Sequence, residues 1–165
     1  MLYFIITEKE TQMIRAAFLL MMLLCTTAMT PQEHFVKAPF HNIMAHDTQC
    51  MTEVIYREAP DEPYEGKMAV ATVVVNRLHS RGFPKTICAV IYQKGQFSWT
   101  TMKLHKPDLK LYAEARRIAL YVLSGHKQTT IGNALYFHNL SVNPSWDHVR
   151  LIQQIGNHAF YVAVR

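Results

Sequence analysis

The stretch Ile55-Tyr-Arg-Glu-Ala-Pro-Asp-Glu-Pro-Tyr-Glu-Gly66 decides the fold, because one apolar helix pattern ends in it and another begins. Before it, apolar residues recur three and four positions apart over residues 51–55, as in a helix with one buried face. Pro60 and Pro63 then interrupt that pattern, since proline lacks an N–H and clashes with the preceding turn. Residues 68–76 resume it and predict a second helix.

Glu58 falls at the end of the first predicted helix, just before the proline break. A carboxyl group at such a junction can be partly desolvated, which raises its pKa and makes it a proton donor near neutral pH. Cleavage of a glycosidic bond needs such a donor. The alternative is an exposed acid at a helix end, paired with Arg57 or Arg77.

The other elements follow from periodicity and turn residues. We expect an α+β, mainly helical single domain over residues 47–165, with small hairpins framing a cleft, preceded by a linker over 29–46. The expected helices are 47–59, opened by Asp47 or Thr48, then 63–80, 85–92 and 108–124, and the strands are 96–100, 134–138 and 156–162, with a loop over 142–146.

The chain has 165 residues, half of them apolar, and a formal charge of +5. No Lys/Arg run reaches the density of a nucleic-acid arm, so we expect no nucleic-acid partner. The basic balance fits either a solvated surface or an anionic cell-wall polymer.

Residues 1–28 have the pattern of an export signal. Arg15 precedes the apolar run 16–25 and a group of small residues. The run is shorter than the roughly 20 apolar residues of a comfortable membrane span. We expect translation to start at Met13 and cleavage after Ala28, with an uncleaved membrane anchor as the alternative.

Cys50 and Cys88 remain if the signal is removed. In an oxidising compartment the pair can form one disulfide, and two buried free thiols are the alternative. His41, His46 and Asp47 form the closest histidine cluster but match no standard zinc spacing. We therefore expect no metal and no cofactor.

The region from Cys50 to Tyr161 resembles the bacterial cell-wall hydrolase family typified by spore cortex-lytic enzymes. The matching motifs are Ile55-Tyr56-x-Glu58-Ala59, Glu62-Pro63-x-Glu65-Gly66, Ala69-Val70-Ala71-x-Val73-Val74-x-Asn76-Arg77, Phe83-Pro84-x-Thr86-Ile87-Cys88, Gln96-Phe97-Ser98-Trp99 and Gly156-x-His158-x-Phe160-Tyr161.

The resemblance implies a lysozyme-like fold related to lytic transglycosylases, peptidoglycan glycan strands as substrate, and Glu58 as the catalytic acid. This chain has Pro60-Asp61 where family members commonly have Arg-Gly, which could reshape the turn beside Glu58. Spore enzymes tend to carry a separate peptidoglycan-binding domain, and a role in germination is not carried over.

Further residues are candidates for binding the sugar. Glu62 and Glu65 could equally be favourable charges at a helix start, and the aromatic residues could equally be core. The candidates are Glu62, Glu65, Gln96, Ser98, Trp99, Tyr136, His138, Trp146, His158 and Tyr161.

A hydrolase commonly uses two carboxyl groups, and the proline break leaves no second one that can be placed beside Glu58. A lytic transglycosylase needs only one carboxyl group, which favours this reaction, with 1,6-anhydro-muramic ends as products. We expect the enzyme to be exported and monomeric. The alternatives are a hydrolytic muramidase or glucosaminidase, a non-catalytic peptidoglycan-binding module, and a metal-dependent amidase or peptidase.

Overall fold

The computed structural model describes residues 38–103 and 105–164, so the predicted signal peptide lies outside it. No helix in these residues is long and apolar enough to cross a membrane. The α+β, mainly helical architecture is confirmed. The elements are α2 (Ala38–Glu58), α3 (Tyr64–His79), α4 (Ile87–Ile91), the 3-10 helix η1 (Ser98–Thr101), α5 (Leu109–Leu123), the 3-10 helix η2 (Thr129–Ile131), β1 (Tyr136–Asn139), β2 (Val149–Ile155) and β3 (His158–Ala163).

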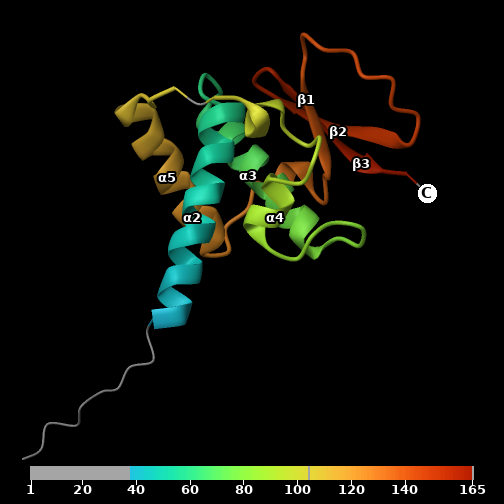
Figure 1. Cartoon of the computed structure of the whole chain (residues 1–165). Helices are drawn as coiled ribbons and strands as arrows, with labels where there is room; N and C mark the ends of the chain where they lie inside the picture. The colour runs from blue at the N-terminus through green and yellow to red at the C-terminus, as the bar shows by residue number, and fades with distance from the viewer. Residues whose placement is uncertain (1–37, 104, 165) are drawn as a thin grey trace, which may run out of the picture. The chain divides into compact units, whose positions relative to one another are not determined.

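Helix α3 is the centre of the helical part. Every residue from Gly66 to Arg77 is buried, which is typical of a helix enclosed on all sides. Helices α2, α4 and α5 all pack against it, and α2 also packs along α5 (Figure 1). The buried apolar side chains of these helices form one core with Phe160 of the sheet.

Most helix ends lie where the sequence predicts them. Asp108 caps α5 by accepting the backbone N–H groups of Lys110 and Leu111, at 2.8 and 3.0 Å. Helix α2 differs, because it begins at Ala38 and not at Asp47 or Thr48. The Thr48 hydroxyl donates to the Met44 carbonyl inside the helix, so this residue bonds to the preceding turn and caps nothing.

The sheet is antiparallel, with strand order β1-β3-β2. Strands β1 and β3 match the predicted strands, with boundaries shifted by one or two residues. Strand β2 was not predicted, because a bulge between Leu151 and Gln153 breaks its apolar–polar alternation. Gly156, with φ +56°, forms the turn between β2 and β3.

The predicted strand over 96–100 is wrong, since this segment contains the 3-10 helix η1. The Thr100 hydroxyl donates to the Phe97 carbonyl, and the Thr101 hydroxyl to the Ser98 carbonyl, which close the turn. Phe97 and Trp99 are nevertheless buried and Ser98 is exposed. The polar–apolar alternation therefore predicted correctly which side chains are buried, but it predicted the wrong backbone conformation.

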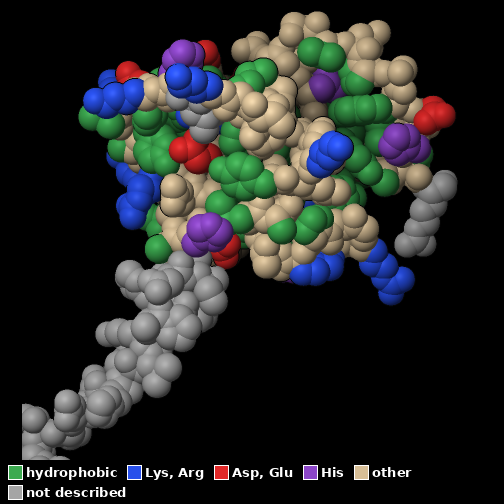
Figure 2. All heavy atoms as spheres, viewed as in Figure 1, with side chains coloured by type: hydrophobic (Ala, Val, Ile, Leu, Met, Phe, Trp, Pro, Cys, Tyr) green, Lys and Arg blue, Asp and Glu red, His purple; other side chains and the backbone are tan. Residues whose placement is uncertain are grey.

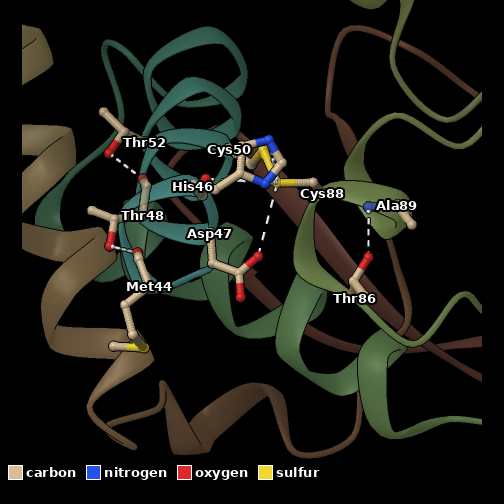
Figure 3. Close-up of a disulfide and its surroundings, with 9 residues drawn as sticks. All are labelled: Met44, His46, Asp47, Thr48, Cys50, Thr52, Thr86, Cys88 and Ala89. Carbon is tan, nitrogen blue, oxygen red and sulfur yellow. Dashed lines mark hydrogen bonds between the residues drawn. A yellow bond between two sulfur atoms is a disulfide. The ribbon is translucent and has the colours of Figure 1, made fainter. Parts of the chain in front are cut away.

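The Cys50–Cys88 disulfide joins α2 to α4 across 38 residues of sequence (Figure 3). The predicted pairing is confirmed. Thr86 caps α4 by accepting the Ala89 N–H at 3.3 Å, and His46 Nδ1 lies 3.3 Å from the Cys88 sulfur. The disulfide therefore fixes the short helix that leads into the segment containing Trp99.

Candidate active site

Glu58 is the last residue of α2 and its side chain is partly buried. One of its oxygens, Oε1, accepts a hydrogen bond of 2.6 Å from the indole N–H of Trp99. Trp99 is itself held in place, with its ring stacked on Phe97 and edge-on to Tyr92, each at 5.9 Å between centroids. The orientation of the Glu58 carboxyl group is thus set by a rigid aromatic partner.

Burial raises the pKa of Glu58, against the opposing effects of the Trp99 hydrogen bond and the positive charge of Arg77. Arg77 is buried, its Nε donates to the Leu135 carbonyl at 2.8 Å, and burial lowers its pKa to about 10. Its Nη1 has no hydrogen-bond partner within the described part of the chain. Burial thus shifts Glu58 toward its protonated form relative to a free carboxyl group, and Arg77 places a positive charge nearby.

Glu62 has a different environment from the one expected of a sugar-binding residue. It is only 7% exposed, its Oε2 accepts the backbone N–H of Asn157 at 2.9 Å, and its Oε1 lies 3.5 Å from His158 Nδ1. His158 is also buried, and desolvation lowers its pKa. These contacts fit a pair that ties the β2–β3 turn to the start of α3 better than direct contact with a glycan.

Four of the predicted aromatic residues lie together on the sheet and the loop before β2. His138 Nε2 and the Tyr161 hydroxyl are 2.8 Å apart, and the Trp146 ring lies 5.6 and 5.7 Å from those two rings. Tyr136 lies 5.9 Å from Trp146 and close enough to Arg77 to affect its pKa. This group, Tyr136, His138, Trp146 and Tyr161, is named the sheet aromatic cluster below.

Two contacts link strand β1, which carries Tyr136 and His138, to the surroundings of Glu58. Phe137 of β1 packs against Phe97 at 6.2 Å, and Arg77 is near both Tyr136 and Glu58. Gln96 is partly exposed and Ser98 is exposed beside Trp99, whereas Glu65 is exposed in the first turn of α3. The structure thus brings Trp99 to Glu58, and Arg77 lies near both Glu58 and Tyr136 of the cluster.

Two features of the site were missed in the sequence. Arg77 was considered only as a possible ion-pair partner, although it is buried and also lies near Tyr136 of the sheet aromatic cluster. Tyr92 and Lys94 were not considered, although they lie next to the predicted segment 96–99 and line a hollow beside Trp99. The Lys94-Gly95 turn signal was the available clue.

One group of side chains among the described residues has metal-ligand types close together. His46, Cys50 and Cys88 place their donor atoms within 4.8 Å of one another. The two sulfurs are joined in the disulfide, which leaves His46 as the available donor of the three (Figure 3). The side chain of His41 lies outside the description, and the expected absence of a metal stays a prediction.

Residues 61–161 match the cell wall hydrolase family. The chain belongs to this family. It is 39% identical over 117 residues to a spore cortex-lytic enzyme of Oceanobacillus iheyensis, covering 70% of this chain and 41% of that protein. It is 34% identical over 132 residues to the spore cortex-lytic enzyme of Bacillus cereus, covering 79% of this chain and 49% of that protein.

Two solved structures are similar to the fold. The catalytic domain of Bacillus cereus SleB superposes with a TM-score of 0.59 at 33% identity, covering 70% of this chain and 89% of that domain. The catalytic domain of the germination-specific lytic transglycosylase SleB of Bacillus anthracis gives 0.58 at 33% identity, covering 69% and 92%. The expected family and fold are confirmed, whereas the role of Glu58 stays a prediction because Glu58 precedes the matched range.

Proposed function

We propose that the protein is a peptidoglycan lytic transglycosylase in which Glu58 acts alone as acid and base. The observation that carries the proposal is the partly buried Glu58 carboxyl, with its pKa raised by burial and its Oε1 bound by the Trp99 N–H at 2.6 Å. A carboxyl group with a raised pKa keeps its proton to higher pH than an ordinary one, and glycosidic cleavage requires a proton donor.

The hydrogen bond assigns roles to the two oxygens of Glu58. Because Oε1 accepts the Trp99 N–H, the proton is carried by Oε2. Oε2 gives this proton to the glycosidic oxygen as the bond between that oxygen and C1 of the muramyl unit breaks, which leaves positive charge at C1. The Glu58 carboxylate formed is stabilised by the Trp99 N–H and the Arg77 charge.

The second step restores the acid. The 6-hydroxyl oxygen of the muramyl unit attacks C1, and its proton moves to the Glu58 carboxylate. The products are a 1,6-anhydro-muramyl end, a free 4-hydroxyl on the departing sugar and protonated Glu58. No water is consumed, so no second carboxylate is needed to activate one.

The other acids near the end of α2 support this one-acid scheme. Glu62 is enclosed by Asn157 and His158, and Glu53 is paired with Arg57 at 3.2 Å. Asp61 and Glu65 are exposed to solvent, so neither shares the partly buried setting of Glu58.

The cellular setting is part of the proposal. The relatives are cortex-lytic enzymes, which supports a location outside the cytoplasm and peptidoglycan strands as the partner. The chain spans less than half the length of these relatives, so their whole activity is not carried over. On the face shown in Figure 2, Lys and Arg side chains lie in small separate groups. The absence of a nucleic-acid partner stays a prediction. Export, a monomeric state and membrane attachment through an uncleaved N-terminus stay predictions.

The test is the release of soluble muropeptides from purified peptidoglycan by the full chain. Glu58→Gln should lower the rate about 1,000-fold, the middle of the range for loss of a general acid. Asp61→Asn, which removes an exposed acid in the loop after α2, should leave the rate within about twofold. Full activity of the Glu58 variant would remove it from the catalytic role, and binding without release by the unsubstituted chain would indicate a non-catalytic module.

A further inference from the structure

A hollow of about 480 Å³ lies in the turn between α4 and η1. Its lining includes Tyr92, Lys94, Phe97, Ser98 and Thr100. The volume lies within the range of small-molecule sites, which combine an apolar lining with a few polar groups. The hollow is therefore large enough to hold one substituted sugar unit.

The hollow is separated from the candidate acid by one side chain. Tyr92 and Phe97 both contact the ring of Trp99, at 5.9 Å between centroids, and Trp99 binds Glu58. A glycan strand that presents a glycosidic bond to Glu58 can therefore place a neighbouring sugar here. Tyr92 is 48% exposed, so its ring offers an open face to such a sugar.

Lys94 is held at the rim of the hollow by a tight turn. The Gln96 N–H donates to the Gln93 carbonyl at 3.1 Å, and Gly95 has φ +82°, the geometry of the third position in a type II turn. Lys94 thus occupies the second position of the turn and is exposed.

The ammonium group of Lys94 takes no part in an ion pair within the described residues. Arg57 pairs with Glu53 and Lys67 with Glu114, whereas Lys94, like most Lys and Arg residues in 38–103 and 105–164, has no carboxylate within ion-pair distance. An unneutralised cation beside an aromatic face suits a ligand that is a sugar carrying negative charge.

We infer that this hollow is a subsite for a muramyl unit, in which Lys94 binds the carboxylate that the unit carries and Tyr92 packs against its ring. The inference rests on the proposed function for the identity of the strand. The carboxylate is either that of the free lactyl group or that of a peptide attached to it. Lys94 then discriminates muramyl-containing strands from neutral β-1,4-linked N-acetylglucosamine oligomers.

The test measures Kd for purified glycan strands with the full chain carrying Glu58→Gln, so that strands are bound without turnover. Adding Lys94→Gln should raise Kd for strands with free lactyl carboxylates about fivefold, the effect of one exposed ion pair. Lys94→Arg should restore binding. Lys127→Gln removes the same charge beside a different hollow, formed with Asn76 and His79, and should change nothing.

Chemical variants of the strand separate the sources of the effect. When the lactyl carboxylates are converted to methylamides, Lys94→Gln should have no effect, whereas Tyr92→Ala should still weaken binding. An effect of Lys94→Gln confined to strands with intact peptides would assign the contact to the peptide carboxylate. An equal Kd with and without Lys94 on both anionic strands, or an equal loss on neutral strands, would overturn the inference.

Failure of the proposed function gives a different result. If the unsubstituted chain releases no soluble fragments but Kd depends on Lys94 and on the carboxylate, the subsite stands and the catalytic proposal falls. If it releases fragments and Kd is independent of Lys94, the catalytic proposal stands and the subsite falls.

Discussion

Glu58 and Glu62 are the same residue type four positions apart, yet the fold gives them opposite environments. Glu58 has one strong donor, a rigid indole, and burial that raises its pKa. Glu62 is enclosed by a backbone N–H and an imidazole from the β2–β3 turn. The comparison teaches that the chemistry of a carboxyl group follows from its partners and not from its place in a motif.

The proline break produces this difference. Helix α2 ends at Glu58, so residues 59–63 leave the helix axis and carry Glu62 to the far hairpin. A continuous helix would have placed the two carboxyl groups on one face, as i and i+4 neighbours. The local sequence between the helices therefore separates an acid suited to catalysis from an acid suited to holding the sheet.

The largest expected effects come from replacing each of the two glutamates by glutamine and measuring both activity and stability. Glu58→Gln should lower muropeptide release about 1,000-fold and leave the far-ultraviolet circular dichroism spectrum unchanged. Glu62→Gln should instead lower the free energy of unfolding by about 2 kcal/mol, because a buried charged hydrogen bond is weakened. The comparison breaks if Glu62→Gln abolishes activity at temperatures where that variant remains folded.

The next effect concerns the contact between Glu62 and the β2–β3 turn. A Cβ at Gly156 would overlap Glu62 Oε2, and its φ of +56° already disfavours other residues. Gly156→Ala should lower the free energy of unfolding by about 3 kcal/mol, measured by urea denaturation. Gly132 has a similar φ of +48° and open space around it, so Gly132→Ala should cost only about 1 kcal/mol. Equal losses would show that the Glu62 contact contributes little.

A smaller effect tests how Trp99 tunes Glu58. Trp99→Phe removes the donor that stabilises the Glu58 carboxylate, so the pKa of Glu58 should rise further. Activity requires protonated Glu58 and falls as pH rises through that pKa, so the variant should lose activity at a higher pH than the wild type does. The maximal rate should fall about tenfold, since the carboxylate formed during the reaction loses a charged hydrogen bond. An unchanged pH profile would contradict the assigned contact.

The smallest predicted effect is that of Glu58→Gln on the free energy of unfolding. Because its pKa is raised by folding, ionisation of Glu58 reduces stability as pH rises from the ordinary value of 4.5 through the raised one. The Glu58→Gln variant should therefore have a free energy of unfolding on the order of 1 kcal/mol higher than that of the unsubstituted protein at neutral pH. Catalytic groups often reduce stability in this way. The gain should vanish at about pH 4, where both states are protonated. Equal stability of the two proteins at neutral pH would argue against a desolvated Glu58.

The sequence predicted the helical framework well, because its signals are local. Apolar spacing, the Asp108 cap and the proline break placed α3 and α5 within one or two residues. It failed at η1, where threonine hydroxyls close a 3-10 turn without changing which side chains are buried, and at β2, where a β-bulge breaks the alternation of side chains. It also failed at the start of α2, where Thr48 is an interior residue.

The site was predictable in part for a related reason. Glu58, Trp99 and Tyr161 belong to segments with recognisable motifs, whereas Tyr136, His138 and Trp146 were candidates only by residue type. The structure brings Trp99 onto Glu58. The enclosure of Glu62 and the proximity of Arg77 depend on contacts between residues distant in sequence, such as Glu62 with Asn157. Lys94 became a candidate only when the structure placed it on the hollow beside Trp99.

The most direct test of a single acid that works without water is digestion of purified peptidoglycan in heavy-oxygen water, followed by mass spectrometry of the soluble products. The account predicts anhydro-muropeptides that contain no heavy oxygen and that disappear in the Glu58→Gln variant. Reducing-end products that contain one heavy oxygen would contradict it, because they require an activated water and a hydrolytic mechanism.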